Sequence, residues 1–546
     1  MDDYYDLGSY SRHVSTESAD AQRWFDRGLI WTYGYHHEEA IECFRKSLEF
    51  DPHCVMSHWG IAYASGPNYN KKWVDFDDDE KQSCLADAHH AVAAATAHID
   101  NASDLEAGML GALAHRYPEG DSIDDFGPCN NAFADVMRKV YQQFSDDMDV
   151  CTIFAEALMN RTPWQLWDLP SGKPAEGADT LEAIEVLESA FTRLAKKGAN
   201  QHPGLLHMYI HLMEMSPTPE KALNVGNRLT GLVPDAGHLQ HMATHIDVLC
   251  GDYQNVVTRN HNAIQVDKKY LQRGGALNFY SLYRCHNYHF KIYGAMFLGQ
   301  QQVAMDTANE LESTLPREVL EPMADWIEPF FPMKQHVLIR FGRWDEIKQQ
   351  SLPDDAELYA MTHALMHYAK TVAHAATGDI AAAEAARDDF RAAKAAMPET
   401  RYLFNNSCID ILGVAEAMLE GELSYRKGDF DAAFDQLRRS VELDDTLPYD
   451  EPWGWMQPTR HALGALLLEQ ERIEEAAAVY RADLGFDGTL ARPCQHPNNV
   501  WSLHGLHECL QKLGHNEEAG ILKPQLDIAL ARADVTINYS CFCRGM

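Results

Sequence analysis

Histidine residues gather in three short bursts between residues 207 and 289, and one glutamate, Glu214, follows the first burst. Within each burst most neighbours are three or four residues apart. On a helix this spacing places side chains on one face. The bursts contain seven of the 27 histidines of the chain: His207, His211, His238, His241, His245, His286 and His289.

The chemistry that suits such faces is metal binding. A metal holds imidazole nitrogens at about 2.0–2.1 Å, so its ligands must converge from neighbouring helices. Neutral imidazole suits copper, iron and zinc, and two helices with paired histidines plus a third resemble the layout of type 3 dicopper sites. Copper is therefore the preferred metal, with iron or zinc as alternatives. Met208 stands where a metalloprotease helix carries glutamate after its first histidine, which disfavours a zinc protease.

Two further residues are candidates for catalytic roles. Glu214 could complete an iron centre of histidines and one carboxylate. It is also the best candidate for a water-activating base if the protein is a metal-dependent hydrolase. Tyr209 could hold an imidazole in one tautomer by bonding its second nitrogen.

A helical repeat has to position these side chains. Residues 24–52 have the spacing typical of the 34-residue tetratricopeptide unit, in which small residues let two antiparallel helices approach and aromatic residues fill the space between units. Turns beginning Gly251, Gly342, Gly378 and Gly428 indicate later units. The pattern consists of Trp24, Gly28, Trp31, Ala40, Phe44, Ser47 and Pro52. We expect an all-α, tetratricopeptide-type solenoid of helical hairpins, a right-handed superhelix of about eight or more repeats.

The resemblance to tetratricopeptide proteins implies where the histidines lie. In that family the second, fifth, ninth and twelfth residues of each first helix line a concave groove. In the repeat frame of this chain all seven histidines and Glu214 occupy such positions. Histidine is about 5 % of the chain, so chance would place fewer than one in the groove positions of these three repeats. The pattern favours a site over scattered core histidines.

Several segments are similar to one histidine-rich group of tetratricopeptide proteins from bacteria and fungi, for which no settled activity is implied. Ala243 departs from that group, where proline is usual, and predicts a straighter helix without loss of a ligand. The segments are Glu156–Met159, Trp164–Asp168, His207–Ser216, Gly237–His245, His286–Phe290 and Asp450–Trp453.

The order of the repeats predicts five divisions of the chain. The predicted divisions are an N-terminal lead at 1–20, helical repeats at 21–200, the histidine-rich repeats at 201–315, C-terminal repeats at 316–530 and a tail at 531–546. The tail carries Cys541 and Cys543, whose spacing is too short for the usual zinc knuckle and leaves a ligand or redox role open.

The charge and hydropathy of the chain argue against two classes of binding partner, nucleic acids and membranes. The formal charge of -35 repels nucleic acid and anionic membranes, and no apolar run is long enough for a signal or a membrane span. The scattered cysteines are typical of a reducing compartment, so we expect a cytoplasmic protein.

Aromatic and polar residues outside the bursts could wall a pocket for a small substrate. They are Trp164, Trp167, His336, Glu451, Trp453 and His461. The leading hypothesis is a metal-dependent oxidoreductase or oxygenase acting on a small organic molecule. The alternatives are a scaffold whose groove binds a peptide without metal, and a metal-dependent hydrolase.

Overall fold

The structure is a computed structural model that describes residues 4–120, 124–199 and 201–545. The predicted lead and tail therefore include residues 1–3 and 546, which lie outside the described residues. The chain is all-α and divides into two compact units, Met1–Ile246 and Asp247–Met546. This division falls inside the predicted histidine-rich segment and coincides with none of the boundaries predicted at residues 200, 315 and 530.

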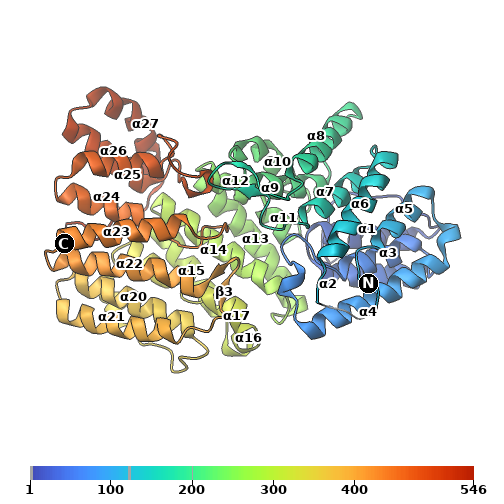
Figure 1. Ribbon diagram of the computed structural model, residues 1–546, viewed down its shortest axis with the longest axis horizontal. Coiled ribbons are helices and arrows are strands. Elements are labelled where there is room, and N and C mark those ends of the chain that lie inside the picture. Colours follow the sequence, from blue (N-terminus) through green and yellow to red (C-terminus); the bar gives the residue numbers. More distant parts are fainter. Residues whose placement is uncertain (1–3, 121–123, 200, 546) are drawn as a thin grey trace. The chain divides into compact units, whose positions relative to one another are not determined.

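Unit 1 consists of helices that pack mainly on their neighbours in the chain (Figure 1). Its helices are α1 (Ala19–Tyr33), α2 (His37–Phe50), α3 (Val55–Ala64), α4 (Asp78–Ala97), α5 (Asp104–Leu113), α6 (Gly127–Phe144), α7 (Met148–Met159), α8 (Thr180–Lys196), α9 (Pro203–Glu214), α10 (Leu223–Leu229), α11 (Gly237–His241) and α12 (Ala243–Leu249), the last of which continues into unit 2. Two antiparallel strands of two residues each, β1 (Trp167–Asp168) and β2 (Lys173–Pro174), form a hairpin that precedes α8.

Unit 2 has the same hairpin construction. Its helices are α13 (Tyr253–Gly274), α14 (Tyr280–Leu298), α15 (Gln301–Ser313), α16 (Arg317–Leu320), α17 (Ala324–Ile327), α18 (Met333–Arg340), α19 (Trp344–Gln349), α20 (Ala360–Ala376), α21 (Ile380–Ala395), α22 (Cys408–Arg426), α23 (Phe430–Asp445), α24 (Thr459–Glu469), α25 (Ile473–Asp483), α26 (Val500–Leu513) and α27 (Asn516–Arg532). A second short hairpin joins β3 (Tyr402–Leu403) to β4 (Asn406–Ser407).

The first hairpin confirms the predicted repeat. Helices α1 and α2 pack together, and the Phe44 ring fills the space where Gly28 of α1 and Gly60 of α3 approach it. A Cβ atom at Gly60 would lie 2.5 Å from Phe44 Cζ, and one at Gly28 would lie 2.6 Å from Phe44 Cε1. The two glycines are therefore required by packing, because any side chain would collide with the ring.

The four predicted hairpin turns are also present. Gly251, Gly342, Gly378 and Gly428 each have a positive φ, a conformation that glycine adopts without steric cost. Each lies two residues before the first residue of the second helix of its pair. The all-α hairpin architecture predicted from the repeat is thus what the chain adopts.

Unit 2 closes on itself. Its hairpins pack in order from α13 to α27, and α26 and α27 then contact α14 near the start of the unit. Trp501 of α26 donates from Nε1 to the Met296 carbonyl of α14 at 2.7 Å. We call this closed arrangement of α13–α27 the ring. No helix in the described part of either unit is long and apolar enough to cross a membrane.

Candidate metal centre

Helix α9 presents His207 and His211 one turn apart. The helix begins at Pro203, which suits the first position because it needs no amide hydrogen. His202 caps the helix, with Nδ1 accepting from the Leu205 amide at 3.2 Å. All twelve residues of α9 are buried, so both imidazoles lie inside the protein.

The second group of histidines comes from α11 and α12. His238 and His241 belong to α11 and His245 to α12, and each is at most 1 % exposed. The straight helix predicted from Ala243 is not formed, because the helix is interrupted at Met242. The hydroxyl of Thr244 donates to the His241 carbonyl at 2.7 Å and so competes with the helical backbone bond.

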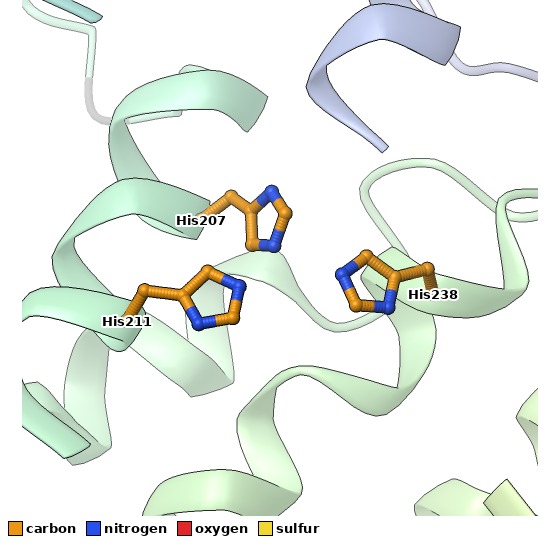
Figure 2. A group of neighbouring side chains, drawn as sticks. All are labelled: His207, His211 and His238. Atoms are coloured by element: carbon orange, nitrogen blue, oxygen red, sulfur yellow. The ribbon is translucent and has the colours of Figure 1, made fainter. Parts of the chain in front are cut away.

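The structure brings three imidazoles together across these elements. His207 and His211 from α9 and His238 from α11 turn toward a shared space (Figure 2). One nitrogen of each ring lies within 4.8 Å of one nitrogen of both others. The predicted convergence of the first two histidine bursts is therefore present in unit 1.

The protons on the α9 histidines are fixed by groups that can only accept. His207 Nδ1 lies 2.6 Å from the Tyr33 carbonyl oxygen, so Nδ1 must carry the hydrogen. His211 Nδ1 lies 3.0 Å from one oxygen of the Glu214 carboxylate and donates in the same way. In the neutral rings, Nε2 of both residues therefore holds a lone pair. Both Nε2 atoms are buried and without a hydrogen-bond partner.

The same rule fixes the second pair. His245 Nδ1 donates to the other Glu214 oxygen at 2.8 Å. His241 Nδ1 lies 3.1 Å from Thr244 Oγ1, whose only hydrogen already goes to the His241 carbonyl, so the oxygen accepts from Nδ1. Nε2 of His241 and Nε2 of His245 are therefore also lone-pair atoms.

These two Nε2 atoms face each other at 2.6 Å. Two neutral lone pairs repel at that distance, and a cation between them removes the repulsion. Nitrogens bound to one ion in a near-tetrahedral site lie about 3.3 Å apart, since each bond is about 2.0–2.1 Å. A small outward rotation of either ring would reach that spacing.

Burial keeps the α9 imidazoles neutral. Burial lowers the pKa of His207 to about 3, despite the bond to the Tyr33 carbonyl. Burial, with the neighbouring histidines, lowers the pKa of His211 well below its usual value. At neutral pH no proton would compete with a metal for these nitrogens.

Glu214 lies in α9 with no exposed surface and joins the two groups of histidines. Its two oxygens accept from His211 and His245, the arrangement in which a carboxylate behind an imidazole orients it toward a metal. Tyr209 points elsewhere: its hydroxyl donates to Glu188 of α8 at 3.0 Å.

Tyr35 caps the centre and was not anticipated from the sequence. Its ring centroid lies 4.6 Å from that of His207, 5.8 Å from His211 and 5.7 Å from His238. Its φ of 54° is rare for a residue other than glycine and marks a position held by its surroundings. The signal in the sequence was weak, because Tyr35 lies in the loop after α1.

Two of the predicted pocket residues lie beside the centre. The Trp164 ring contacts Tyr69 and His211, with centroids 5.1 Å and 6.1 Å away. Trp167 of β1 donates from Nε1 to the Leu212 carbonyl of α9 at 2.8 Å and so supports that helix.

The third histidine burst belongs to α14 of unit 2. His286 packs its ring edge-on against Phe290 and Phe404. Nε2 of His289 lies 2.7 Å from Met456 Sδ. These two histidines are thus held by contacts of their own unit.

The other four predicted pocket residues also belong to unit 2. The His336 ring packs against Trp455 at 4.9 Å between centroids. Trp453 donates to Asp444, and Glu451 accepts from the Tyr449 hydroxyl. His461 donates from Nε2 to the buried carboxylate of Asp483 at 3.0 Å, in an arrangement typical of a structural polar core.

Comparison with protein families identifies the type of repeat in one segment of the chain. A tetratricopeptide repeat model matches residues 36–54, which span α2. No curated protein sequence matches the chain.

Solved helical-repeat structures are similar to the whole chain at low scores. A human IFIT1 dimer with m7Gppp-AAAA has 10 % identity and a TM-score of 0.31, with 95 % of this chain and 91 % of that chain covered. Yeast Tom70 has 13 % identity and a TM-score of 0.30, with 94 % and 92 % covered. The Cut9 and Hcn1 hetero-tetramer of the APC/C has 14 % identity and a TM-score of 0.27, with 95 % and 94 % covered. The chain is thus an all-α protein of helical hairpins in which residues 36–54 match a tetratricopeptide repeat.

Proposed function

We propose that unit 1 binds a transition metal through the Nε2 atoms of its buried histidines. The ligands would be His207, His211 and His238 on one side and His241 with His245 on the other. The observation that carries the proposal is the direction of the protons: four of these rings donate Nδ1–H to a fixed acceptor and direct a lone pair inward.

The arrangement is difficult to explain without a cation. A buried polar nitrogen left unsatisfied costs about 1–3 kcal/mol, and His207 and His211 each bury one. The facing Nε2 atoms of His241 and His245 add a repulsion between lone pairs. Metal binding at the two groups would satisfy these atoms.

We infer that the bound metal serves an oxidoreductase acting on a small organic molecule, with copper preferred and iron or zinc as alternatives. A copper or iron ion with imidazole ligands supplies electron transfer and oxygen chemistry when bound. The chain itself would hold the imidazoles neutral and oriented. Tyr35 and Trp164 would restrict access of water to the His211 side.

The hydrolase alternative is less well supported. Both oxygens of Glu214 accept from imidazole Nδ1–H groups, so this carboxylate is engaged in orienting His211 and His245 rather than poised to deprotonate water. We propose Glu214 as a positioning residue.

The scaffold alternative is favoured by a specific finding, the tetratricopeptide match. In that case the metal would rigidify unit 1, and the protein would bind other proteins without catalysing a reaction. Oxygen consumption by the metal-loaded protein with candidate phenols, thiols and amines separates the two functions.

The first experiment is elemental analysis of the purified protein by plasma mass spectrometry. We expect about one or two equivalents of copper, iron or zinc per chain, lost when His207, His211, His241 and His245 are changed to alanine. The matched control changes His53 and His98, an exposed pair whose nitrogens lie 3.2 Å apart, and should keep the metal. A native protein that stays metal-free after reconstitution with each ion would refute the proposal.

A further inference from the structure

Residues 533–545 lie against the ring of unit 2 without regular secondary structure. After α27 ends at Arg532, residues 533–545 form neither helix nor strand. We call residues 533–545 the tail. Its buried residues recur every third position, at Ile537, Ser540 and Cys543. One side of the segment therefore faces the ring, and its last residues form a turn in which the Arg544 amide donates to the Cys541 carbonyl at 3.2 Å.

The tail is anchored at its beginning by helix α15. The Asp534 carboxylate accepts from the Gln301 amide at 2.6 Å and from the Gln302 amide at 3.0 Å, and so caps the helix. The Asp534 amide donates to the Gly299 carbonyl, and Ile537 fills the space beside Gly299.

Side chains of helices far away in the sequence bind the centre of the tail. Ser540 Oγ accepts from the Tyr480 hydroxyl and donates to the His461 carbonyl at 2.9 Å. Arg340 donates to the Ser540 carbonyl at 3.3 Å, and Arg426 donates to the Cys543 carbonyl.

Carboxylates of α24 and α26 bind the end of the tail. Arg544 makes two parallel bonds to Glu508 of α26, at 2.7 Å and 2.8 Å. The Gly545 amide donates to Glu469 of α24 at 2.9 Å. Cys541 and Cys543 form a disulfide, and with Arg340 and Trp455 they line a cavity of only about 20 Å³, roughly the space of one water.

The polar contacts have the character of ligand recognition, and they stand beside apolar packing of Ile537 at Gly299 and of Phe542 at Gly342 and Trp501. Side chains from α18, α22 and α24–α26 bind main-chain groups and one arginine of a segment that contributes no regular structure. The ring does not need the tail to close, because Trp501 of α26 contacts α14 directly. We therefore expect the ring to keep its closure without the tail and to expose the polar groups that bind it.

We propose that the ring of unit 2 is a binding site for a peptide and that the tail is its resident ligand. The partner is a segment of another protein with the chemistry of the tail: an apolar residue, a serine three positions later, a small residue three further on, and an arginine directly after it. Because the tail is tethered next to the site at high effective concentration, the partner binds only when the tail leaves. The proposal does not rest on the metal centre.

The test uses the full chain with a protease recognition sequence inserted between Arg532 and Ala533. The probe is a fluorescent synthetic peptide of residues 533–545 in its disulfide form, and the measurement is fluorescence anisotropy. We expect no binding to the uncut chain, and binding of one peptide per chain after cleavage and dialysis. A peptide with Arg544→Glu should bind at least about tenfold more weakly, and the Glu508→Arg chain should restore its binding.

A second measurement needs no cleavage. In the uncut chain, Arg544→Glu should speed proteolysis of the tail, and Glu508→Arg should reverse this. Either of two results overturns the proposal. One is that cleavage unfolds unit 2, seen as lost helical circular dichroism, which would make the tail a part of the fold. The other is that the folded, cleaved chain fails to bind the probe or binds the Arg544→Glu peptide equally well.

Discussion

The carboxylate of Glu214 determines which nitrogens the centre offers. It accepts from Nδ1 of His211 and of His245, and both rings therefore present Nε2 to the site. A histidine whose second nitrogen is bonded in this way is fixed in tautomer and orientation. One buried residue thus links the ligands of α9 to those of α12.

We predict that Glu214→Gln weakens metal binding about 10–100-fold, the usual cost of losing such a partner. Glutamine replaces one of the two acceptor oxygens with an NH2 donor, so the imidazole that bonds to that oxygen loses its acceptor. Affinity is measured by competition with a chelator of known metal affinity. The control is Glu188→Gln, which affects only the bond from Tyr209. Unchanged affinity in Glu214→Gln would remove its positioning role.

A second residue-scale property is the protonation of His461 in unit 2. Arg340 donates into its Nδ1 at 3.0 Å, so this nitrogen must be unprotonated. Burial lowers the pKa of His461 to about 4, although Asp483 opposes this. Since the folded pKa lies below the unfolded value of about 6.5, stability from this residue is complete above pH 6.5 and falls as the pH drops toward 4.

We predict that the free energy of unfolding of unit 2 falls between pH 7 and pH 4, with His461 contributing up to about 3 kcal/mol. Glutamine can accept from Arg340 and donate to Asp483, so His461→Gln should lose less stability over this range. Urea unfolding at several pH values measures the difference. The exposed His515→Gln variant should behave like the native protein. Identical pH profiles for His461→Gln and the native chain would contradict the assignment.

At the scale of elements, the first hairpin depends on close packing around one ring. Phe44 of α2 occupies the space left by two glycines, one on α1 and one on α3. Interiors this dense tolerate little added volume. The small and aromatic residues of the repeat pattern therefore mark the positions at which α1, α2 and α3 contact one another.

We predict that Gly60→Ala destabilises unit 1 by about 1–3 kcal/mol, because the new Cβ lies 2.5 Å from Phe44 Cζ. Gly111→Ala is the matched control, since Gly111 lies in helix α5 and its Cβ would meet nothing within 4 Å. That control should gain up to about 1 kcal/mol, because alanine favours helix. Thermal unfolding of both variants gives the comparison, and a Gly60→Ala variant as stable as native would refute the packing argument.

At the scale of the whole molecule, the chain divides into two compact units, and the two proposed sites fall one in each. Unit 1 holds the converging imidazoles, and unit 2 holds the tail in its closed ring. A ligand stabilises only the part of a protein that binds it. The two proposed sites should therefore respond to different ligands.

We predict that a saturating metal raises the unfolding temperature of unit 1 and leaves that of unit 2 unchanged. At a free metal concentration of 100 times Kd the stabilisation is about 2.7 kcal/mol. Differential scanning calorimetry with and without metal resolves the effect. The shift should vanish in a variant with His207 and His211 changed to alanine. Equal shifts in both units would show that binding is not confined to unit 1.

The sequence by itself determined the class of fold and the grouping of histidines. The spacing of Gly28, Ala40 and Phe44 specified a helical hairpin, and His207 and His211, four residues apart, share one face of α9. These are local properties, because helical geometry relates residues that are close in the chain. The same periodicity placed Glu214 on the face of His207 and His211.

Only the tertiary structure decided which nitrogens face inward and which residues surround them. His207 owes its tautomer to the Tyr33 carbonyl, 174 positions away, and Tyr35 reaches the centre from the loop that follows Tyr33. The division of the seven histidines between two units and the seating of the tail on the ring are also tertiary. Such acceptors and contacts come from segments that the folded path brings together, and spacing along the chain carries no information about that path.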